Sequence, residues 1–380
     1  MKYLFWCANE HLEFRIPEFE ALSRLFDIEL TWIHKSDRDP WIILDLPTEA
    51  PAKQILSRSI SVKYCIELWG EGQSYDELFE RVESFIKKEQ TALEKYISED
   101  RSFKMYTEAF MKNSRMRIGK VRMKDPDDVY SHFEFWGFDH NNLPKSALRL
   151  FFGRCIGSGM RHLVAKYSIK SRLFIGNTTM DPTFQGHARI PGARPFCGHG
   201  ISYTWCLGVW RVFLWGDIDY LMMHARTQAE EGREHEGNFE QYGLERLYGD
   251  ILVADNSRPP WREEVPWFGA ILADPPYGIR EPTEKVGTHR ENVAISTEHL
   301  PQHYPSKIEY GLSDIIEDLM NLSANCLEIG GRLAFWYPVN REEYKESILP
   351  QNPRLKLCAN CEQVLSSHTS RRLLVYEKLS

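Results

Sequence analysis

The stretch Gly269-Ala-Ile-Leu-Ala-Asp-Pro-Pro-Tyr-Gly278 decides how this chain is expected to fold. Its first five residues are small or apolar, which favours a buried strand that ends at Asp274. Pro275 and Pro276 lack N–H groups and have a fixed φ, so the turn is stiff and its carbonyls are acceptors. The carboxylate of Asp274 and the Pro275 carbonyl would accept the two N–H groups of an exocyclic amine on a nucleobase, with Tyr277 stacked on the base. The alternative is a simple Pro-Pro turn that Asp274 caps.

Two further apolar stretches end in acidic residues. Leu214 to Ile218 includes Asp217, and Ile251 to Ala254 is followed by Asp255. Strands that alternate with helices and end in acidic residues are typical of an open, mostly parallel sheet, which binds ligands outside the carboxyl ends of its strands. An α/β domain of about seven strands is therefore predicted from about Ser171 onwards.

The end of this predicted domain has its own signals. Ser313 is expected to cap a helix that Gly330-Gly331 stops, and Leu333 to Tyr337 is expected to form the next strand. Two last strands, Glu362 to Leu365 and Leu373 to Tyr376, flank a polar turn and predict an antiparallel hairpin.

The N-terminal part of the chain predicts small α+β modules. Tyr3 to Cys7, Trp41 to Leu46 and Ile60 to Leu68 are apolar enough for strands, and Ser74-Tyr-Asp-Glu77 is a capping box that opens a helix. The segment from Lys145 to Arg172 mixes basic residues with glycines, so we expect a connector there.

Length and composition limit the class of protein. A chain of 380 residues suits two or three domains, and 42% hydrophobic with 27% charged residues is typical of globular proteins. Without a long apolar run or a signal peptide, we expect a soluble cytoplasmic protein and no membrane segment. Eight cysteines are too sparse for a disulfide scaffold. The single CxxC pair, Cys358 and Cys361, is interpreted as strand packing, so no metal site is predicted.

Charge is distributed unevenly along the chain. The net charge is −7, yet residues 101–180 hold fifteen lysines and arginines against six acidic residues, together with several aromatic residues. This composition suits contact with a phosphate backbone and with bases, although a solvated face is the alternative. The residues that we expect to contact nucleic acid are Arg115, Arg117, Lys120 and Arg122.

The chain resembles a known family. The turn from Asp274 to Tyr277 resembles the signature of amino-methyltransferases that depend on S-adenosylmethionine. The surrounding blocks resemble the catalytic subunit of eukaryotic tRNA (guanine(10)-N2)-methyltransferases over nearly the whole chain. These blocks are residues 10–15, 67–70, 174–181, 216–220, 241–244, 271–281, 330–333 and 366–372.

The resemblance implies a domain plan and partners. Residues 1–145 would form a ferredoxin-like and THUMP-like region that binds tRNA, residues 146–172 a basic linker, and residues 173–380 a Rossmann-like methyltransferase domain. It further implies S-adenosylmethionine as cofactor and a small zinc-binding activator subunit as partner. The implied reaction is methylation of the exocyclic N2 amine of guanine 10 in tRNA.

The resemblance also implies roles for individual residues. Asp217 would accept the ribose hydroxyls of the cofactor, Asp255 its adenine amine, and Asp274 with Tyr277 the guanine. In the family, an Asp-Pro-Phe-x-Gly-Thr-Gly-Gly loop lies under the methionine part of the cofactor. Gly198 and Gly200 keep two of its glycines here.

The same loop departs from the family pattern. It reads Arg194-Pro-Phe-Cys-Gly-His-Gly-Ile201, and residues 182–216 contain no Asp, Glu or Lys. We interpret the segment as the product of a shifted reading frame or a mis-joined exon; the alternative is a genuine divergence that removes cofactor binding. Two other functions therefore stay open: a catalytically impaired RNA-binding homologue, and an amino-methyltransferase acting on another nucleobase or a protein amide.

Overall fold

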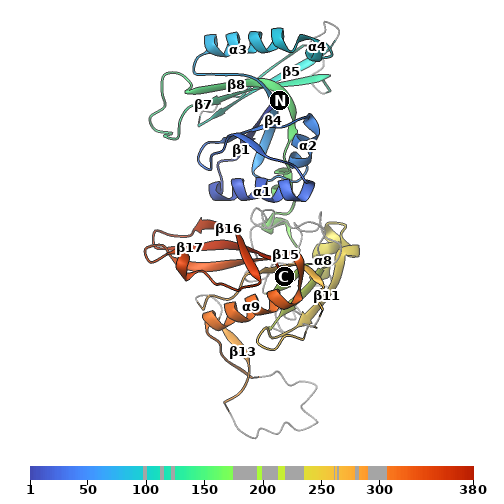
Figure 1. Ribbon diagram of the computed structural model, residues 1–380, viewed down its shortest axis with the longest axis vertical. Helices are drawn as coiled ribbons and strands as arrows, with labels where there is room; N and C mark the ends of the chain where they lie inside the picture. Colours follow the sequence, from blue (N-terminus) through green and yellow to red (C-terminus); the bar gives the residue numbers. More distant parts are fainter. Residues whose placement is uncertain are drawn as a thin grey trace. The chain divides into compact units, whose positions relative to one another are not determined.

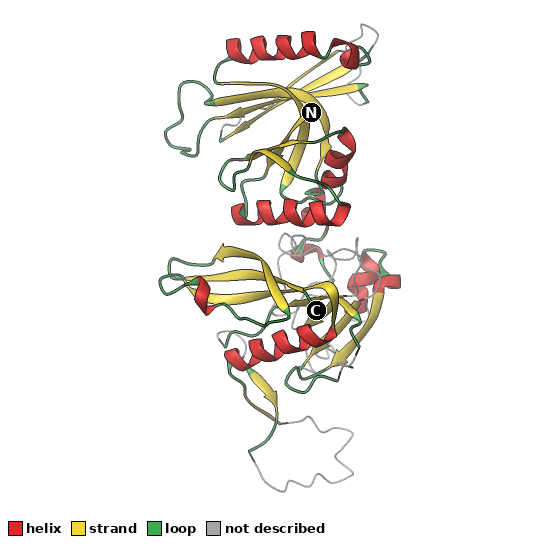
Figure 2. Cartoon of the chain, in the orientation of Figure 1, coloured by secondary structure: helices red, strands yellow, loops and turns green. Residues whose placement is uncertain are grey.

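The chain forms two compact units. The computed structural model describes residues 1–96, 101–111, 115–120, 125–173, 195–198, 213–218, 235–260, 262, 265–278, 282–289 and 306–380. The N-terminal unit is Met1–His162, and the C-terminal unit is Leu163–Ser380. Each unit has its own sheet and helices, as Figures 1 and 2 show.

The N-terminal unit is built on one eight-stranded sheet with the order β2-β3-β1-β4-β8-β7-β5-β6. In Figure 1, α1 and α2 lie beside β1 and β4, and α3 lies beside β8. The elements are β1 (Lys2–Cys7), α1 (Arg15–Phe26), β2 (Thr31–His34), β3 (Trp41–Asp45), α2 (Glu49–Leu56), β4 (Val62–Gly72), α3 (Tyr75–Lys88), α4 (Gln90–Leu93), β5 (Phe103–Phe110), β6 (Arg115–Lys120), β7 (Asp128–Phe135) and β8 (Arg149–Ser158).

Strand β1 supplies side chains to both faces of this sheet. Phe5 packs in the core that includes α1 and α2, and Trp6 packs in a second core on the other face, as the period of two in a strand requires. Trp6 stacks on Phe133 with ring centroids 4.8 Å apart, and Trp41 lies against Phe151 at 5.1 Å. Burying these rings stabilises the join between the two halves of the sheet.

The segment that the sequence predicted as a linker contains a central strand of this sheet. Strand β8 lies between β4 and β7, inside residues 146–172. A Cβ atom added to Gly153 would lie 1.9 Å from the carbonyl oxygen of Glu67, so glycine permits the close approach of β8 to β4. The division between the two units falls after His162, whereas residue 145 was expected to end the first region.

The C-terminal unit is built on a seven-stranded sheet with the order β11-β10-β9-β12-β15-β17-β16. Strands β9, β10, β11, β12 and β15 pair in parallel, and β17 pairs antiparallel with β15 and β16. This order confirms the predicted Rossmann-like domain and its antiparallel end. The strands are β9 (Pro195–Gly198), β10 (Phe213–Asp217), β11 (Tyr248–Val253), β12 (Phe268–Ala273), β15 (Leu327–Asn340), β16 (Leu355–Val364) and β17 (Thr369–Lys378).

Helices and a pair of short strands also belong to the C-terminal unit. Among the described residues, its other helices are α5 (His162–Lys166), which starts at the boundary, α8 (His235–Gln241) and α9 (Leu312–Cys326), and β13 (Glu284–Val286) pairs antiparallel with β14 (Lys307–Glu309). Leu319 and Met320 of α9 pack in the apolar core with Ile271 of β12. Within the described residues, no helix is long and apolar enough to cross a membrane.

The predicted ends of α9 are wrong. Gly311, not Ser313, is the N-cap residue, and the helix ends at Cys326. Gly330 and Gly331 lie inside β15, where Gly330 has a φ of +76° and a Cβ on Gly331 would lie 2.7 Å from the Glu328 carbonyl oxygen. These glycines therefore serve a tight bend in a strand rather than a helix end.

Candidate functional site

Near the carboxyl ends of the central parallel strands, three small residues are register partners. Gly198 at the end of β9 lies opposite Gly216 of β10 and opposite Ala273 of β12. Strand β9 is where the strand order reverses, because β10 follows on one side and β12 on the other. Open α/β sheets bind ligands in the crevice at such a switch point. The row of two glycines and one alanine leaves room there, so these residues fit a nucleoside cofactor.

The residues predicted to bind the cofactor are described only in part. Gly198 is the last residue of β9, and Asp217 is the last residue of β10, although the side chain of Asp217 lies outside the described part. Gly200 also lies outside the described residues. The same is true of residues 182–194 and 199–212, which include most of the segment without acidic residues.

Asp255 lies directly after β11 and accepts hydrogen bonds from the loop that follows it and from β13. Its Oδ1 accepts the backbone N–H of Ser257 at 2.8 Å, and its Oδ2 accepts that of Val286 in β13 at 2.7 Å. Since an ionised carboxylate has about four lone-pair positions, two protein donors leave it able to accept a further N–H. The residue is thus placed at the carboxyl edge, as predicted, and its orientation is held by backbone donors.

Asp274 is buried at the end of β12. The residue is 9% exposed, and Pro275, which follows it, is buried as well. The hydroxyl of Tyr277 donates a hydrogen bond to Oδ1 of Asp274. Burial, then the charge of Asp274, raises the pKa of Tyr277 far above its usual value, so this hydroxyl stays a proton donor. The structure therefore shows Tyr277 holding the carboxylate; the predicted stacking on a base stays a prediction.

A residue that the sequence did not single out also faces this carboxylate. Nη1 of Arg371, on β17, lies 3.6 Å from Oδ2 of Asp274. The guanidinium of Arg371 also lies over the ring of Trp336, 4.2 Å from its centroid, and its Nε donates to Gln363 at 2.7 Å. The block of residues 366–372 was recognised by resemblance, but nothing in a single sequence shows that β17 lies beside the turn after β12.

Two of the family-like blocks, residues 10–15 and 67–70, lie in the N-terminal unit and are structural. Arg15 is fully buried and donates to the carbonyls of Ala8 and Asp39, while Glu18 nearby is 3% exposed and accepts N–H bonds from Ile60 and Ser61. These charged groups are hydrogen-bonded, which is what burial of a charge requires. In the second block, Glu67 is buried and accepts a hydrogen bond from Nε of Arg154 at 2.9 Å.

The predicted nucleic-acid contacts lie at one edge of the N-terminal sheet. Arg115, Arg117 and Lys120 belong to β6, which is an edge strand and pairs only with β5 in the described sheet. Their backbone partners on β5 are Glu108, Tyr106 and Phe103. The side chains of β6 and the whole of Arg122 lie outside the described part of the chain.

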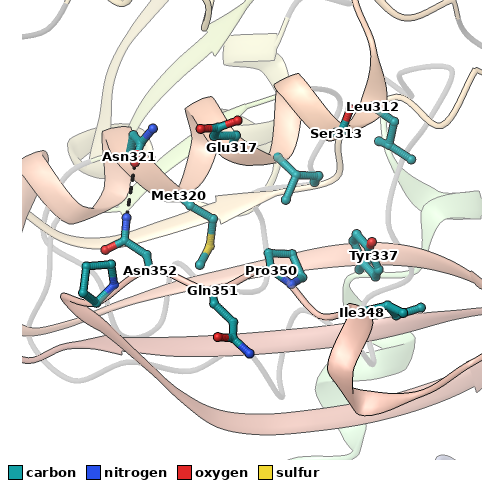
Figure 3. A pocket seen from close by; sticks show the side chains of 12 residues that line it. Leu312, Ser313, Glu317, Met320, Asn321, Tyr337, Ile348, Pro350, Gln351 and Asn352 are labelled. Carbon is teal, nitrogen blue, oxygen red and sulfur yellow. Dashed lines mark hydrogen bonds between the residues drawn. The ribbon is translucent and has the colours of Figure 1, made fainter.

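A cavity of about 480 Å³ lies elsewhere in the C-terminal unit, along α9 (Figure 3). Its wall includes Met320 and Tyr337, together with Asn352 and Asn321, which are joined by a 3.2 Å hydrogen bond. None of the predicted site residues lines it.

Among the described residues, no group of three or more His, Cys, Asp or Glu is arranged to hold a metal ion. Cys358 and Cys361 lie on β16, and Cys361 is 2% exposed.

Comparisons with known proteins agree over the whole chain. Residues 1–161 match the family model of the Tmrp11 THUMP N-terminal domain. The curated protein tRNA (guanine(10)-N(2))-methyltransferase TRMT11 of Bos taurus is 36% identical over 411 residues, covering 100% of this chain and 88% of that protein. Its namesake in Xenopus laevis is 37% identical over 410 residues, covering 100% of this chain and 84% of that protein.

More distant proteins share less. The Dictyostelium discoideum protein of the same name is 29% identical over 429 residues, covering 100% of this chain and 82% of that protein. A solved rRNA methylase from Streptococcus thermophilus aligns with 52% of this chain and 94% of its own, at 13% identity and a TM-score of 0.31. The identity over the full chain confirms the resemblance seen in the sequence. The chain belongs to the family of tRNA (guanine(10)-N2)-methyltransferases.

Proposed function

We propose that this chain transfers a methyl group from S-adenosylmethionine to the exocyclic N2 amine of guanine 10 in tRNA. Membership of the methyltransferase family supports the reaction. The observation that carries it in this molecule is Asp274, a buried carboxylate that starts a two-proline turn at the carboxyl edge of the parallel sheet, beside its switch point. In an open α/β sheet, ligands bind outside the carboxyl ends of the strands at the switch point, so the cofactor and the guanine would meet beside Asp274.

The chemistry asks little of the protein beyond geometry and charge. S-adenosylmethionine supplies an electrophilic methyl group on a sulfonium sulfur. Asp274 and the Pro275 carbonyl accept the two N–H groups of the guanine amine, which turns the nitrogen lone pair towards that methyl group. As the N–C bond forms, the C–S electron pair goes to sulfur and one proton leaves the nitrogen for Asp274 or water. The carboxylate stabilises the positive charge that develops on nitrogen in the meantime.

The cofactor would lie along the edge formed by the ends of β9, β10 and β11. In this proposal the backbone around Gly198 and Gly200 holds the methionine part, and Asp217 accepts the ribose hydroxyls. Asp255 accepts the adenine amine with the lone pairs that Ser257 and Val286 do not occupy. The small residues opposite Gly198 support this placement, because bulkier side chains would fill the crevice.

The N-terminal unit would bind the tRNA. Its match to a THUMP family model over residues 1–161 and the basic segment from Arg101 to Met180 support this assignment. The residues that we expect to contact phosphates are Arg115, Arg117, Lys120 and Arg122. We further propose that the reaction takes place in the cytoplasm. The division into a tRNA-binding region and a catalytic domain follows the two units that the structure shows.

A small activator subunit would bind the edge of the catalytic sheet. Strand β11 lies at one edge of the sheet, beside β10. Leu252 and Val253 on it are 37% and 46% exposed. An exposed apolar edge strand has unpaired N–H and C=O groups that another chain can pair with. We propose that the partner adds a strand there.

One methyl-transfer experiment tests this function. The purified protein, with and without its activator, is given S-adenosylmethionine labelled in the methyl group and an unmodified tRNA pool, and the nucleosides are then separated. We expect label in N2-methylguanosine at position 10. Label in another base would favour the alternative amine substrate. No transfer, combined with no binding of labelled cofactor by folded protein that still binds tRNA, would favour the impaired RNA-binding homologue that the altered loop at residues 194–201 suggests.

A further inference from the structure

We propose that Arg371 is a positioning residue that holds the carboxylate of Asp274 ionised and oriented for the amine. The inference rests on the proposed function of Asp274. It assigns a second task to the C-terminal hairpin of β16 and β17, whose antiparallel strands otherwise only extend the sheet beyond β15 (Figure 1).

The guanidinium of Arg371 is held from several sides. It lies over the ring of Trp336, which is itself fully buried on β15, at 4.2 Å from the ring centroid. Its Nε donates to the side chain of Gln363, the residue directly opposite on β16. Stacking fixes the plane of the group and the hydrogen bond fixes its rotation, so the remaining nitrogens point in a set direction. That direction leads to Asp274, 3.6 Å away.

The arrangement joins residues that are far apart in the sequence. Along the sheet, Arg371 lies opposite Pro338 of β15 and Gln363 of β16. Strand β15 in turn pairs with β12, the strand that directly precedes Asp274. The side chain of Arg371 thus extends from β17 across β15 to the turn at Asp274.

The charge of Arg371 can act strongly on Asp274 because both side chains are largely shielded from water. The side chain of Asp274 is 9% exposed and that of Arg371 is 17% exposed, so their attraction is screened less than it would be at the surface. At 3.6 Å the pair is wider than a hydrogen bond. The cation therefore favours the ionised carboxylate without the bidentate fork that would occupy both of its oxygens.

The other side chains that hold this pair carry no charge. Tyr277, on the same turn, donates its hydroxyl to Oδ1 and stays protonated. From β15 and β16 the neighbours of Arg371 are Trp336 and Gln363, which are neutral groups. Loss of the arginine would therefore leave a buried carboxylate beside a neutral hydroxyl, and such a carboxylate takes up a proton at higher pH.

The next residue along β17 offers a matched control. Arg372 lies over the ring of Tyr344 at 4.4 Å and hydrogen-bonds to Asn360. It is therefore a stacked, half-buried arginine on the same strand, like Arg371. Successive side chains of a strand point to opposite faces of the sheet, so Arg372 lies on the face away from Asp274.

The experiment compares Arg371→Met, Arg371→Lys and Arg372→Met in the full chain with its activator. Methionine keeps the apolar stem and removes the charge, whereas lysine keeps the charge and removes the planar fork. The measurements are kcat and KM for tRNA over a range of pH, together with the thermal melting temperature. Asp274→Asn is measured beside them.

For Arg371→Met we expect kcat to fall about 100-fold and KM for tRNA to change less than about threefold. The acid limb of kcat should move to higher pH. Arg371→Lys should restore much of kcat and return the acid limb towards its original position. Arg372→Met should leave kcat and the pH profile unchanged. A purely structural arginine would instead lower the melting temperature and leave the acid limb in place.

Three results would overturn the inference: an unshifted acid limb in Arg371→Met, a kcat close to that of the original protein, or the same loss in Arg372→Met. If Arg371→Met does not fold, Arg371→Gln is the second neutral variant: an acid limb that moves to higher pH supports the role of the charge, and an unshifted acid limb refutes it. A fully active Asp274→Asn would refute the proposed function itself, whereas an inactive Asp274→Asn beside a normal Arg371→Met would refute only this inference.

Discussion

In the proposed mechanism, the carboxylate of Asp274 both orients the guanine amine and supplies a negative charge. Replacing it with asparagine would keep the first role and remove the second. Asparagine keeps a carbonyl oxygen that can accept the hydroxyl of Tyr277 and one N–H of the amine, but it has no negative charge for the developing cation. We expect Asp274→Asn to lower kcat by about 100-fold or more, as removal of one electrostatic stabiliser does in other enzymes. Affinity for tRNA and cofactor should change little. Near-normal turnover would show that a carbonyl suffices and that charge is unimportant.

Buried and exposed carboxylates on one helix should differ greatly in their contribution to stability. Glu18 of α1 is 3% exposed and accepts hydrogen bonds from Ser59, Ile60 and Ser61. Glu20, two residues later, forms an exposed ion pair with Lys35 at 2.9 Å. Glu18→Ala leaves three buried donors without their acceptor and should lower the free energy of unfolding of the N-terminal unit by about 3 kcal/mol.

Glu20→Ala is the matched control, since an exposed pair is worth about 0–1 kcal/mol. Denaturant titration of both variants, followed by hydrogen exchange of the amides of residues 1–162, measures the difference in that unit. Equal stability of the two variants would contradict the structural role assigned to Glu18.

The sequence predicted the turn at Asp274 as a candidate site but not the arginine beside it, for a physical reason. Asp274, two prolines and Tyr277 are consecutive, so their chemistry can be inferred from local geometry alone. Arg371 meets Asp274 only because β17 pairs with β15 and β15 pairs with β12. Such a contact depends on strand order, which hydrophobic periodicity does not contain. The hydrogen bond from the Tyr277 hydroxyl was likewise missed, because the turn folds that side chain back on Asp274.

Elements whose signals lie in consecutive residues were predicted well. Elements that depend on close packing against backbone far away in the sequence were not. The cap at Ser74 is present, since its side chain accepts the N–H of Glu77. Strand β8, by contrast, was taken for a connector because of its glycines. Gly153 is required there by the carbonyl of Glu67, and a Cβ on Gly159, just beyond the strand, would lie 2.2 Å from the carbonyl of Val62. Glycines that allow close strand packing cannot be told from loop glycines in one sequence.

The two edge strands of the C-terminal sheet allow a controlled test of the proposed activator site. Leu252 lies on β11 at one edge and Leu357 lies on β16 at the other, and both are 37% exposed. A lysine on an edge strand opposes the addition of another chain. We expect Leu252→Lys to abolish co-purification of the activator subunit, whereas Leu357→Lys should co-purify with it at the normal ratio.

Co-expression of the tagged chain with its activator, followed by quantification of both chains after affinity purification, measures this ratio. Loss of the activator from Leu357→Lys alone would place the partner at the opposite edge. Retention by both variants would show that neither apolar edge holds the partner.

At the scale of the whole molecule, the basic segment and the proposed catalytic carboxylate belong to different units of the chain. The net charge of −7 conceals the positive excess of residues 101–180, most of which lie in the N-terminal unit, while Asp274 and Arg371 lie in the C-terminal unit. Changes in the basic segment should therefore alter affinity, and changes at Asp274 should alter turnover. This separation is a property of the two units and does not depend on how they are arranged.

Neutralising the basic edge tests this division of labour. We expect the combined change of Arg115, Arg117, Lys120 and Arg122 to glutamine to weaken tRNA binding and to flatten its dependence on salt. For each phosphate that the protein no longer neutralises, the slope of log K against log salt should decrease by about 0.7–0.9, because fewer counterions are released. At saturating tRNA, kcat should stay close to its original value, since none of these residues belongs to the unit that holds the catalytic turn.

The matched control removes four cations that already face carboxylates in the same unit. Lys53, Arg81, Lys87 and Lys88 form exposed ion pairs with Glu49, Glu77, Glu83 and Glu89. Since each is at least half exposed and locally compensated, their change to glutamine should leave both affinity and salt slope nearly unchanged, although the net charge falls by the same amount. Filter-binding titrations at several salt concentrations distinguish the two sets. Equal slopes for both would mean that tRNA responds to total charge alone, and that β6 is a solvated edge rather than a binding surface.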